Sequence, residues 1–166
     1  MIIRTNAKEV AGGLEAYQVR VFKSIFQALT WSMERIVADA VKYIKQHDVI
    51  ASGSLMSSIT EIVRRLTDQL IGEAGTNLTY AKYVHGGTRP HWPPPGPIER
   101  WVALKARRGV MDVGRSIKSV AFLIARAISR YGTKAQPFLE YALNLNQRAM
   151  VDRVAKAINA VNPSAV

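Results

Sequence analysis

The side chains that could perform chemistry are few and widely spaced in this 166-residue chain. Its three histidines, His47, His85 and His91, have no carboxylate at a metal-binding spacing such as His-Glu-x-x-His. No serine stands in a Gly-x-Ser-x-Gly elbow, and no Gly-x-x-x-x-Gly-Lys phosphate loop occurs. The absence of cysteine excludes disulfides and thiolate ligands. We therefore expect no catalytic residue, no metal and no cofactor, and a role in binding or assembly.

Positive charge is the strongest chemical signal. The formal net charge is +11, which favours a polyanionic or acidic partner such as nucleic acid, a membrane surface or an acidic protein ring. Residues 113–135 contain basic side chains and no acidic one. This stretch is either a solvated helix face or a face that contacts DNA phosphates without reading sequence. No aromatic platform for base stacking is evident around it. The candidate face for DNA contact consists of Arg115, Lys118, Arg126 and Arg130.

Length and composition predict one domain over residues 1–166. At 48% hydrophobic residues the chain can bury one core, and it is too short for two comfortable domains. The first residues have no long apolar core typical of a signal peptide or anchor. The most apolar run, residues 120–125, is far shorter than a bilayer span. We expect a soluble protein without a membrane partner, made in a reducing cytoplasm.

A long helix is predicted at the N-terminus. Asn6-Ala7-Lys8-Glu9 has the form of a capping box, and no proline follows before Asp48. The apolar residues of this helix form two adjacent stripes, wider than one core-facing side requires. Either both stripes pack inside the domain, or one meets a neighbouring subunit. The candidate subunit-interface residues on it are Phe22, Phe26, Leu29 and Met33.

A small antiparallel sheet is expected next. Residues 52–55 break the helix, and residues 57–64 have the β-branched enrichment of a strand. Thr67-Asp68 would form the turn before a second strand over residues 69–75. A helix over residues 55–66 is the alternative. Residues 80–85 then predict a short helix or turn that ends at Gly86-Gly87.

The second half is expected to be helical after a proline-rich loop insertion at residues 88–97. Trp92 in this loop either anchors a partner or folds back on Trp101 to close the chain's own core. Helices are predicted from Pro97 to about residue 107, over residues 114–131, and from Pro137 to about residue 161. The apolar stripe of the last helix would include Leu143, Met150, Val154 and Ile158. The fold class is α+β, with a long N-terminal helix on a small, mainly antiparallel sheet and further helices in the C-terminal half.

Short motifs recur in a particular order along the chain. They are Ser-Gly-Ser-Leu at 52–55, Gly-Thr-Asn at 75–77, Tyr-Ala-Lys-Tyr-Val-His-Gly-Gly-Thr at 80–88 and Tyr-Gly-Thr-Lys-Ala-Gln-Pro-Phe-Leu at 131–139. In order and spacing the chain resembles the tail-component family of long-tailed bacteriophages, the tail-completion (head-tail joining, neck) proteins that are gene-product-ten-like in lambdoid phages. The resemblance covers residues 52–143. The acid-free helix and the tryptophan-containing proline loop depart from it.

The resemblance implies a structural virion protein without enzymatic activity. Such a protein would form a homo-oligomeric ring, commonly a hexamer, that joins the tail tube to the head connector or stopper, after assembly in the host cytoplasm. A ring at the neck would enclose the DNA exit channel, where non-specific contact with packaged DNA fits the basic helix. The alternative within this class is a tail terminator that caps the tube. The alternative from another class is a basic, non-specific DNA-binding protein.

Overall fold

The computed structural model describes residues 7–47, 49, 53–67, 69–112, 114 and 116–161. In chain order the elements are α1 (Ala7–Gln46), α2 (Ser54–Ser58), β1 (Thr60–Leu66), β2 (Gln69–Gly75), α3 (Ala81–Gly86), α4 (Pro95–Arg107), α5 (Ile117–Tyr131) and α6 (Phe138–Asn159). The predicted α+β class is confirmed: the long first helix packs on a two-stranded antiparallel sheet, and helices fill the C-terminal half.

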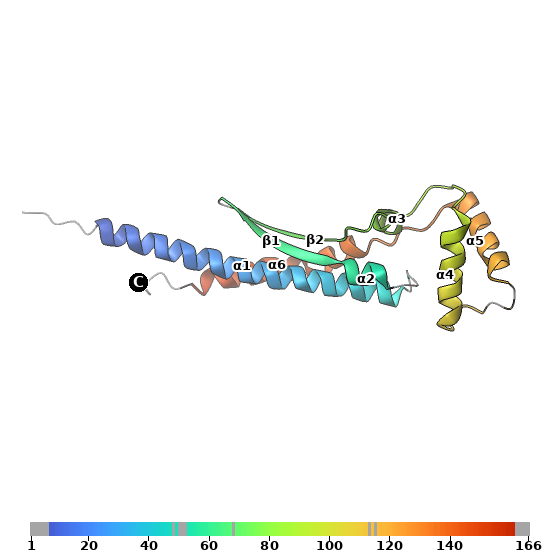
Figure 1. The fold of residues 1–166 in the computed structure, drawn as a ribbon. Coiled ribbons are helices and arrows are strands. Elements are labelled where there is room, and N and C mark those ends of the chain that lie inside the picture. Colours follow the sequence, from blue (N-terminus) through green and yellow to red (C-terminus); the bar gives the residue numbers. More distant parts are fainter. Residues whose placement is uncertain are drawn as a thin grey trace, which may run out of the picture.

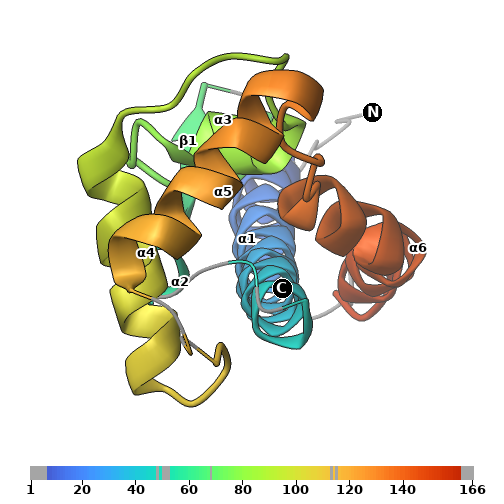
Figure 2. The same ribbon diagram turned by 90° about the vertical axis from the view of Figure 1, so that its right-hand side faces the viewer.

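Helices α1 and α6 pack side by side as an antiparallel rod that forms the long axis of the molecule (Figure 1). Seen along the rod, the two helices lie side by side (Figure 2). Their buried apolar side chains form the core together with residues of α2, α3 and the segment before β1: Met33, Ile36, Ala40, Ile44, Leu55, Ile59, Ala81, Phe138 and Ala142. The rod therefore holds the main core, and shorter elements cover one side of it.

A polar pair is buried between the two helices of the rod. Asn146 Nδ2 donates to Asp39 Oδ2 at 2.8 Å and to the Ala142 carbonyl oxygen at 2.9 Å. Arg35 Nε lies 3.4 Å from the same Asp39 oxygen. Buried polar groups are costly unless they are hydrogen-bonded, so this pair favours one alignment of α1 against α6.

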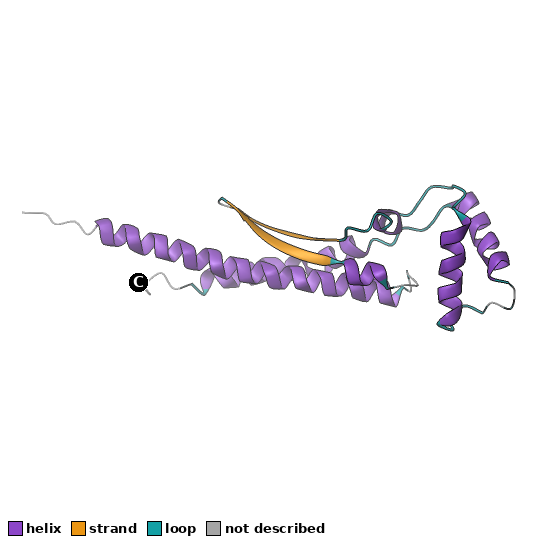
Figure 3. Cartoon of the chain, in the orientation of Figure 1, coloured by secondary structure: helices purple, strands orange, loops and turns teal. Residues whose placement is uncertain are grey.

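The β-hairpin lies along α1 (Figure 3). Val63 pairs with Gly72 in its register, and the side chains of Val63 and Ala74 pack against the core. Gly72 permits close approach, since a Cβ there would lie 2.9 Å from the Cγ and Sδ atoms of Met33. Ile62, one residue from Val63 and so on the opposite face, is exposed. The hairpin therefore has one face on the helix and one face free.

Helices α4 and α5 pack against each other at one end of the rod (Figure 1). Val102 of α4 and Ala121 and Ala125 of α5 are buried. Two segments join this helix pair to the rod, residues 87–94 on the way out and residues 132–137 on the way back. The orientation of α4 and α5 therefore depends on these two segments.

Three predicted boundaries and one predicted apolar face are wrong. Helix α5 begins at Ile117, after the cap Ser116, rather than at residue 114. Helix α4 begins at Pro95 rather than Pro97, so the loop is shorter than residues 88–97. Proline is tolerated there because the first-turn amides of a helix have no intrahelical acceptor. Ser57 and Ser58, predicted in the strand, end α2, and the alternative of a helix over residues 55–66 holds only as far as Ser58. In α6 the buried face carries Phe138, Ala142 and Asn146, whereas the predicted stripe residues Leu143 and Ile158 are exposed.

Candidate functional site

Two of the sequence motifs meet at one place between the rod and the α4–α5 pair. Thr88 and Thr133, 45 residues apart, form an isolated antiparallel bridge. The Thr88 amide donates to the Thr133 carbonyl oxygen at 3.1 Å, and the Thr133 amide donates to the Thr88 carbonyl oxygen at 3.1 Å. The two hydroxyl oxygens lie 3.0 Å apart. We call this bridge, with the glycine that precedes each threonine, the joint.

The two glycines of the joint have nearly the same backbone conformation. Gly87 has φ 72° and ψ −175°, and Gly132 has φ 71° and ψ −159°. These angles lie in a region that is essentially restricted to glycine. A Cβ on Gly87 would lie 2.5 Å from the Thr133 carbonyl oxygen, and a Cβ on Gly132 would overlap the Thr88 carbonyl oxygen. Glycine before each threonine is therefore required for the two segments to approach each other this closely.

The joint continues into the core of the rod. The Gln136 amide donates to the carbonyl oxygens of Val84 and His85, at 3.0 and 3.1 Å. The ring of His85 meets the buried ring of Phe138 edge-on, with centroids 5.2 Å apart. The motif residues are therefore a single structural unit, in which α3 and the start of α6 hold the two connecting segments together.

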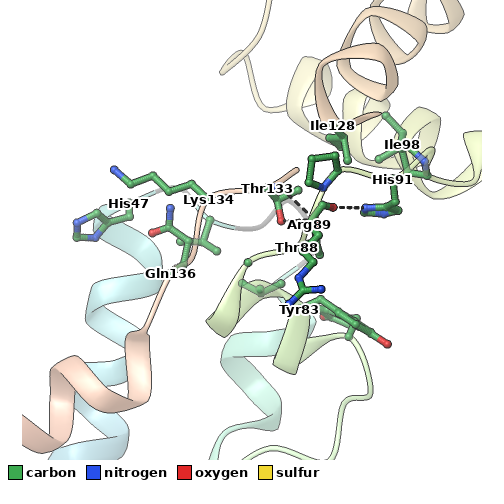
Figure 4. Close-up of a pocket in the computed structure, with 16 residues that line it drawn as sticks. His47, Tyr83, Thr88, Arg89, His91, Ile98, Ile128, Thr133, Lys134 and Gln136 are labelled. Carbon is green, nitrogen blue, oxygen red and sulfur yellow. Dashed lines mark hydrogen bonds between the residues drawn. The ribbon is translucent and has the colours of Figure 1, made fainter. Parts of the chain in front are cut away.

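A groove of about 980 Å³ opens beside the joint. Figure 4 shows its side chains, contributed by the segment after α1, by α3, by the loop before α4, by the segment before α6, and by Ile98 of α4 and Ile128 of α5. The polar and aromatic residues in the lining are His47, Tyr80, Tyr83, Thr88, Arg89, His91, Thr133, Lys134 and Gln136. Among the lining residues that the structure describes there is no carboxylate, and Asp48 lies outside the described residues. Partial burial raises the pKa of the Tyr80 phenol. This lining suits an anionic ligand.

The predicted face for DNA contact lies on α5, at the same end of the molecule. Lys118, Arg126 and Arg130 are all exposed. Arg115, the fourth predicted member, lies outside the described residues. Phe122 stands on the same helical row, four residues from both Lys118 and Arg126, and is 56% exposed. The basic row is therefore interrupted by an exposed aromatic ring.

Trp92 reaches this row from the proline-rich loop. Its ring meets the Phe122 ring edge-on, with centroids 5.9 Å apart, and the side chain is 55% exposed. Trp101 instead lies beneath the Lys105 ammonium, 5.4 Å from its ring centroid. The alternative in which Trp92 closes a core against Trp101 is therefore wrong. Its role as an anchor for a partner stays a prediction.

The four predicted interface residues of α1 have different environments. Met33 is buried in the chain's own core, and Leu29 is half-buried against that core. Phe22 is half-buried, with the Arg65 guanidinium 4.5 Å from its ring centroid. Phe26 is 40% exposed. Of the four, Phe26 is therefore the residue whose ring is most free to meet a neighbouring subunit.

Sequence reasoning missed the joint and the aromatic side chains around it. A signal was present: residues 74–98, like residues 113–139, contain no acidic side chain. The two acid-free segments are the ones that the joint brings together. The expectation that no aromatic platform surrounds the basic helix is wrong, since Trp92 and Phe122 lie on it.

No protein-family model, no curated protein and no solved structure matches the chain. Within the described ranges, no helix is long and apolar enough to cross a membrane. The same residues include no group of three or more His, Cys, Asp or Glu side chains that could hold a metal ion. Functional inference therefore rests on the surfaces and on the joint.

Proposed function

We propose that this protein is a structural subunit of the neck or upper tail of a long-tailed bacteriophage. In this role it forms a ring, of six copies in the simplest case, that joins the tail tube to the head connector. The order of the sequence motifs supports this proposal. That the segments 80–88 and 131–139 meet in one joint adds support, because the resemblance then rests on one structural unit rather than on scattered matches.

Exposed apolar side chains along the rod and the hairpin are the observation that carries the proposal. They include Leu14, Val19, Phe26, Trp31, Ile62, Leu66, Leu145, Val151 and Ile158. Single exposed apolar residues are ordinary, but series of them on α1, β1 and α6 are typical of surfaces that are covered in an assembly. A subunit with different apolar surfaces on different sides can form heterologous contacts, and such contacts close into a ring when the rotation allows it.

The hairpin offers a second means of contact. Among the described residues the sheet has two strands, so each of β1 and β2 has one edge that is not paired. An open edge presents backbone amides and carbonyls that a strand of a neighbouring subunit can pair with. The Arg64–Glu73 ion pair lies on the free face and leaves both edges accessible. An assembled ring would remove these edges from solvent.

The test is the oligomeric state of Phe26→Asp beside Met33→Asp. Light scattering gives the mass, with and without the tail-tube and connector proteins of the same phage, and circular dichroism gives the fold. We expect Phe26→Asp to stay folded and lose assembly, because its ring is partly exposed. Met33→Asp should unfold, because it buries a charge. A wild type that stays a folded monomer with those partners would refute the ring.

Two alternatives give different results in the same assays. A tail terminator would bind the end of the tail tube and not the connector. A free-standing DNA-binding protein would bind duplex DNA as a monomer with strong salt dependence, and the exposed cations Lys118, Arg126 and Arg130 are the observation in its favour. Glutamate substitutions at Arg126 and Arg130 separate these roles. In a neck ring they should impair DNA retention in complete particles and leave assembly intact.

A further inference from the structure

The end of the molecule around the joint combines exposed cations with exposed aromatic rings. The two acid-free segments, 74–98 and 113–139, contribute six exposed cations that the structure describes: Lys82, Arg89, Lys118, Arg126, Arg130 and Lys134. Arg89 and Lys134 line the groove, Lys82 lies on α3, and Lys118, Arg126 and Arg130 lie on α5. Neither segment contains a carboxylate, and Glu99 and Asp112 are the acidic residues in the stretch between them. The six cations outnumber these two carboxylates, so this end attracts polyanions.

Exposed aromatic rings are concentrated in the same segments. Of the eight aromatic side chains that are exposed in the described part of the chain, five belong to them: Tyr80, Tyr83, Trp92, Phe122 and Tyr131. An electrostatic surface for phosphates has no need of such rings. A hydrophobic protein interface would need the rings but would not need the six exposed cations that the same segments carry. Interleaved rings and cations are the combination found where unpaired bases stack and the sugar-phosphate backbone is neutralised.

We propose that the groove and the adjoining face of α5 form a binding site for single-stranded nucleic acid. Tyr83 and Trp92 are the stacking rings, and Arg89 and Lys134, which line the groove, neutralise phosphates. A duplex would satisfy the cations but would leave the rings without bases, because its bases already stack on one another. The inference goes beyond the ring proposal and does not depend on it, since the site lies within one chain.

The loop that carries Trp92 is held by hydrogen bonds within the chain. The His91 amide donates to the Ile128 carbonyl oxygen at 3.4 Å, and His91 Nδ1 donates to the Arg89 carbonyl oxygen at 2.9 Å (Figure 4). Prolines on both sides fix further backbone angles, and Pro93 is buried. On α3 the Lys82 ammonium lies 4.9 Å from the centroid of the Tyr83 ring, which places a cation beside that stacking surface. Little conformational entropy is therefore lost when bases stack.

Fluorescence anisotropy of the monomeric protein with a labelled oligothymidylate of about 16 nucleotides tests the site. Oligothymidylate should bind more tightly than a duplex of the same length and more tightly than polyglutamate. Changing Tyr83 and Trp92 to leucine keeps apolar bulk but removes the rings, and should weaken binding by about tenfold per ring. Changing both to phenylalanine keeps a ring at each position and should preserve most of the affinity.

The cations have a separate readout. Arg89→Gln with Lys134→Gln should lower the slope of log affinity against log salt by about 1.4, because each phosphate contact on a single strand contributes about 0.7. Lys23→Gln with Lys156→Gln removes the same charge from exposed positions at the far end of the rod, and should leave the slope unchanged. Equal binding of oligothymidylate and polyglutamate, tighter duplex binding, or leucine variants with wild-type affinity would each overturn the proposal. None of these results would bear on ring formation.

Discussion

Replacement of Gly132 by alanine should be among the most damaging single-methyl changes in this chain. Its φ of 71° and ψ of −159° lie in the glycine-only region, which costs another residue about 1–3 kcal/mol. The added Cβ would also overlap the Thr88 carbonyl oxygen, a backbone atom that cannot rotate away. The bridge must then separate and lose two backbone hydrogen bonds, each worth about 0.5–1.5 kcal/mol. We expect a total loss of about 2–6 kcal/mol.

Two measurements check this loss. Urea unfolding followed by circular dichroism gives the free energy of unfolding, and hydrogen exchange of the Thr88 and Thr133 amides reports on the joint alone. Gly12→Ala is the matched control, because Gly12 lies inside α1 with open space around it, and alanine there should stabilise by about 0.5–1 kcal/mol. If Gly132→Ala unfolds at the wild-type urea concentration and both amides keep their protection, the joint as described is wrong.

Three further outcomes follow from single contacts. Asn146→Ala should lower the free energy of urea unfolding by about 1–3 kcal/mol, because the buried Asp39 carboxylate loses its amide donor. The control Asn144→Ala, on the exposed side of α6, should change this free energy by less than about 0.5 kcal/mol. Ser116→Ala removes the hydroxyl that caps α5 and should lower the thermal midpoint, at a cost of about 1 kcal/mol; an unchanged midpoint would show that the cap contributes nothing. For Tyr80, a pKa raised by burial means that the unfolded chain deprotonates first, so stability should be constant below about pH 10 and fall above it. Tyr80→Phe should reduce that alkaline fall in urea titrations, and an unaltered pH profile would contradict it.

The elements that local chemistry determines were predictable from the sequence. β2 runs over residues 69–75, as predicted. A turn at Thr67 precedes this short strand, and Gly75 with the polar residues after it ends the strand. The long first helix was predictable from the absence of proline up to Asp48, whereas Asn6 of the predicted capping box lies outside the described residues. The start of α4 was misplaced because proline breaks a helix interior but is compatible with a first turn. Local sequence rules therefore misplace a helix boundary where a residue such as proline is compatible with both a loop and the first turn of a helix.

The tertiary features could not be predicted in the same way. Asn146 lies on the buried face of α6 because Asp39 of α1 faces it, and the hydrophobic pattern of α6 alone favoured the neighbouring stripe. The joint requires Thr88 and Thr133 to meet across 45 residues, which the repeated Gly-Thr dipeptide marks only once the pairing is known. The aromatic rings near α5 were missed for the same reason, because Trp92 comes from a different segment than Phe122. Contacts between distant segments, rather than their secondary structure, are what the sequence leaves open.

The joint lies between the two proposed surfaces, which belong to different parts of the molecule. Their roles can therefore be tested separately. Apolar residues that would contact neighbouring subunits lie on the rod and the hairpin, whereas the rings and cations that would contact nucleic acid lie around the groove and on α5. Arg89 and Trp92 follow the bridge within four residues, so their positions depend on the Gly87 and Gly132 conformations. A change at Phe26 should therefore affect assembly and spare binding. A change at Gly132 should weaken nucleic-acid binding although it removes no cation and no ring, since it displaces the loop that carries both.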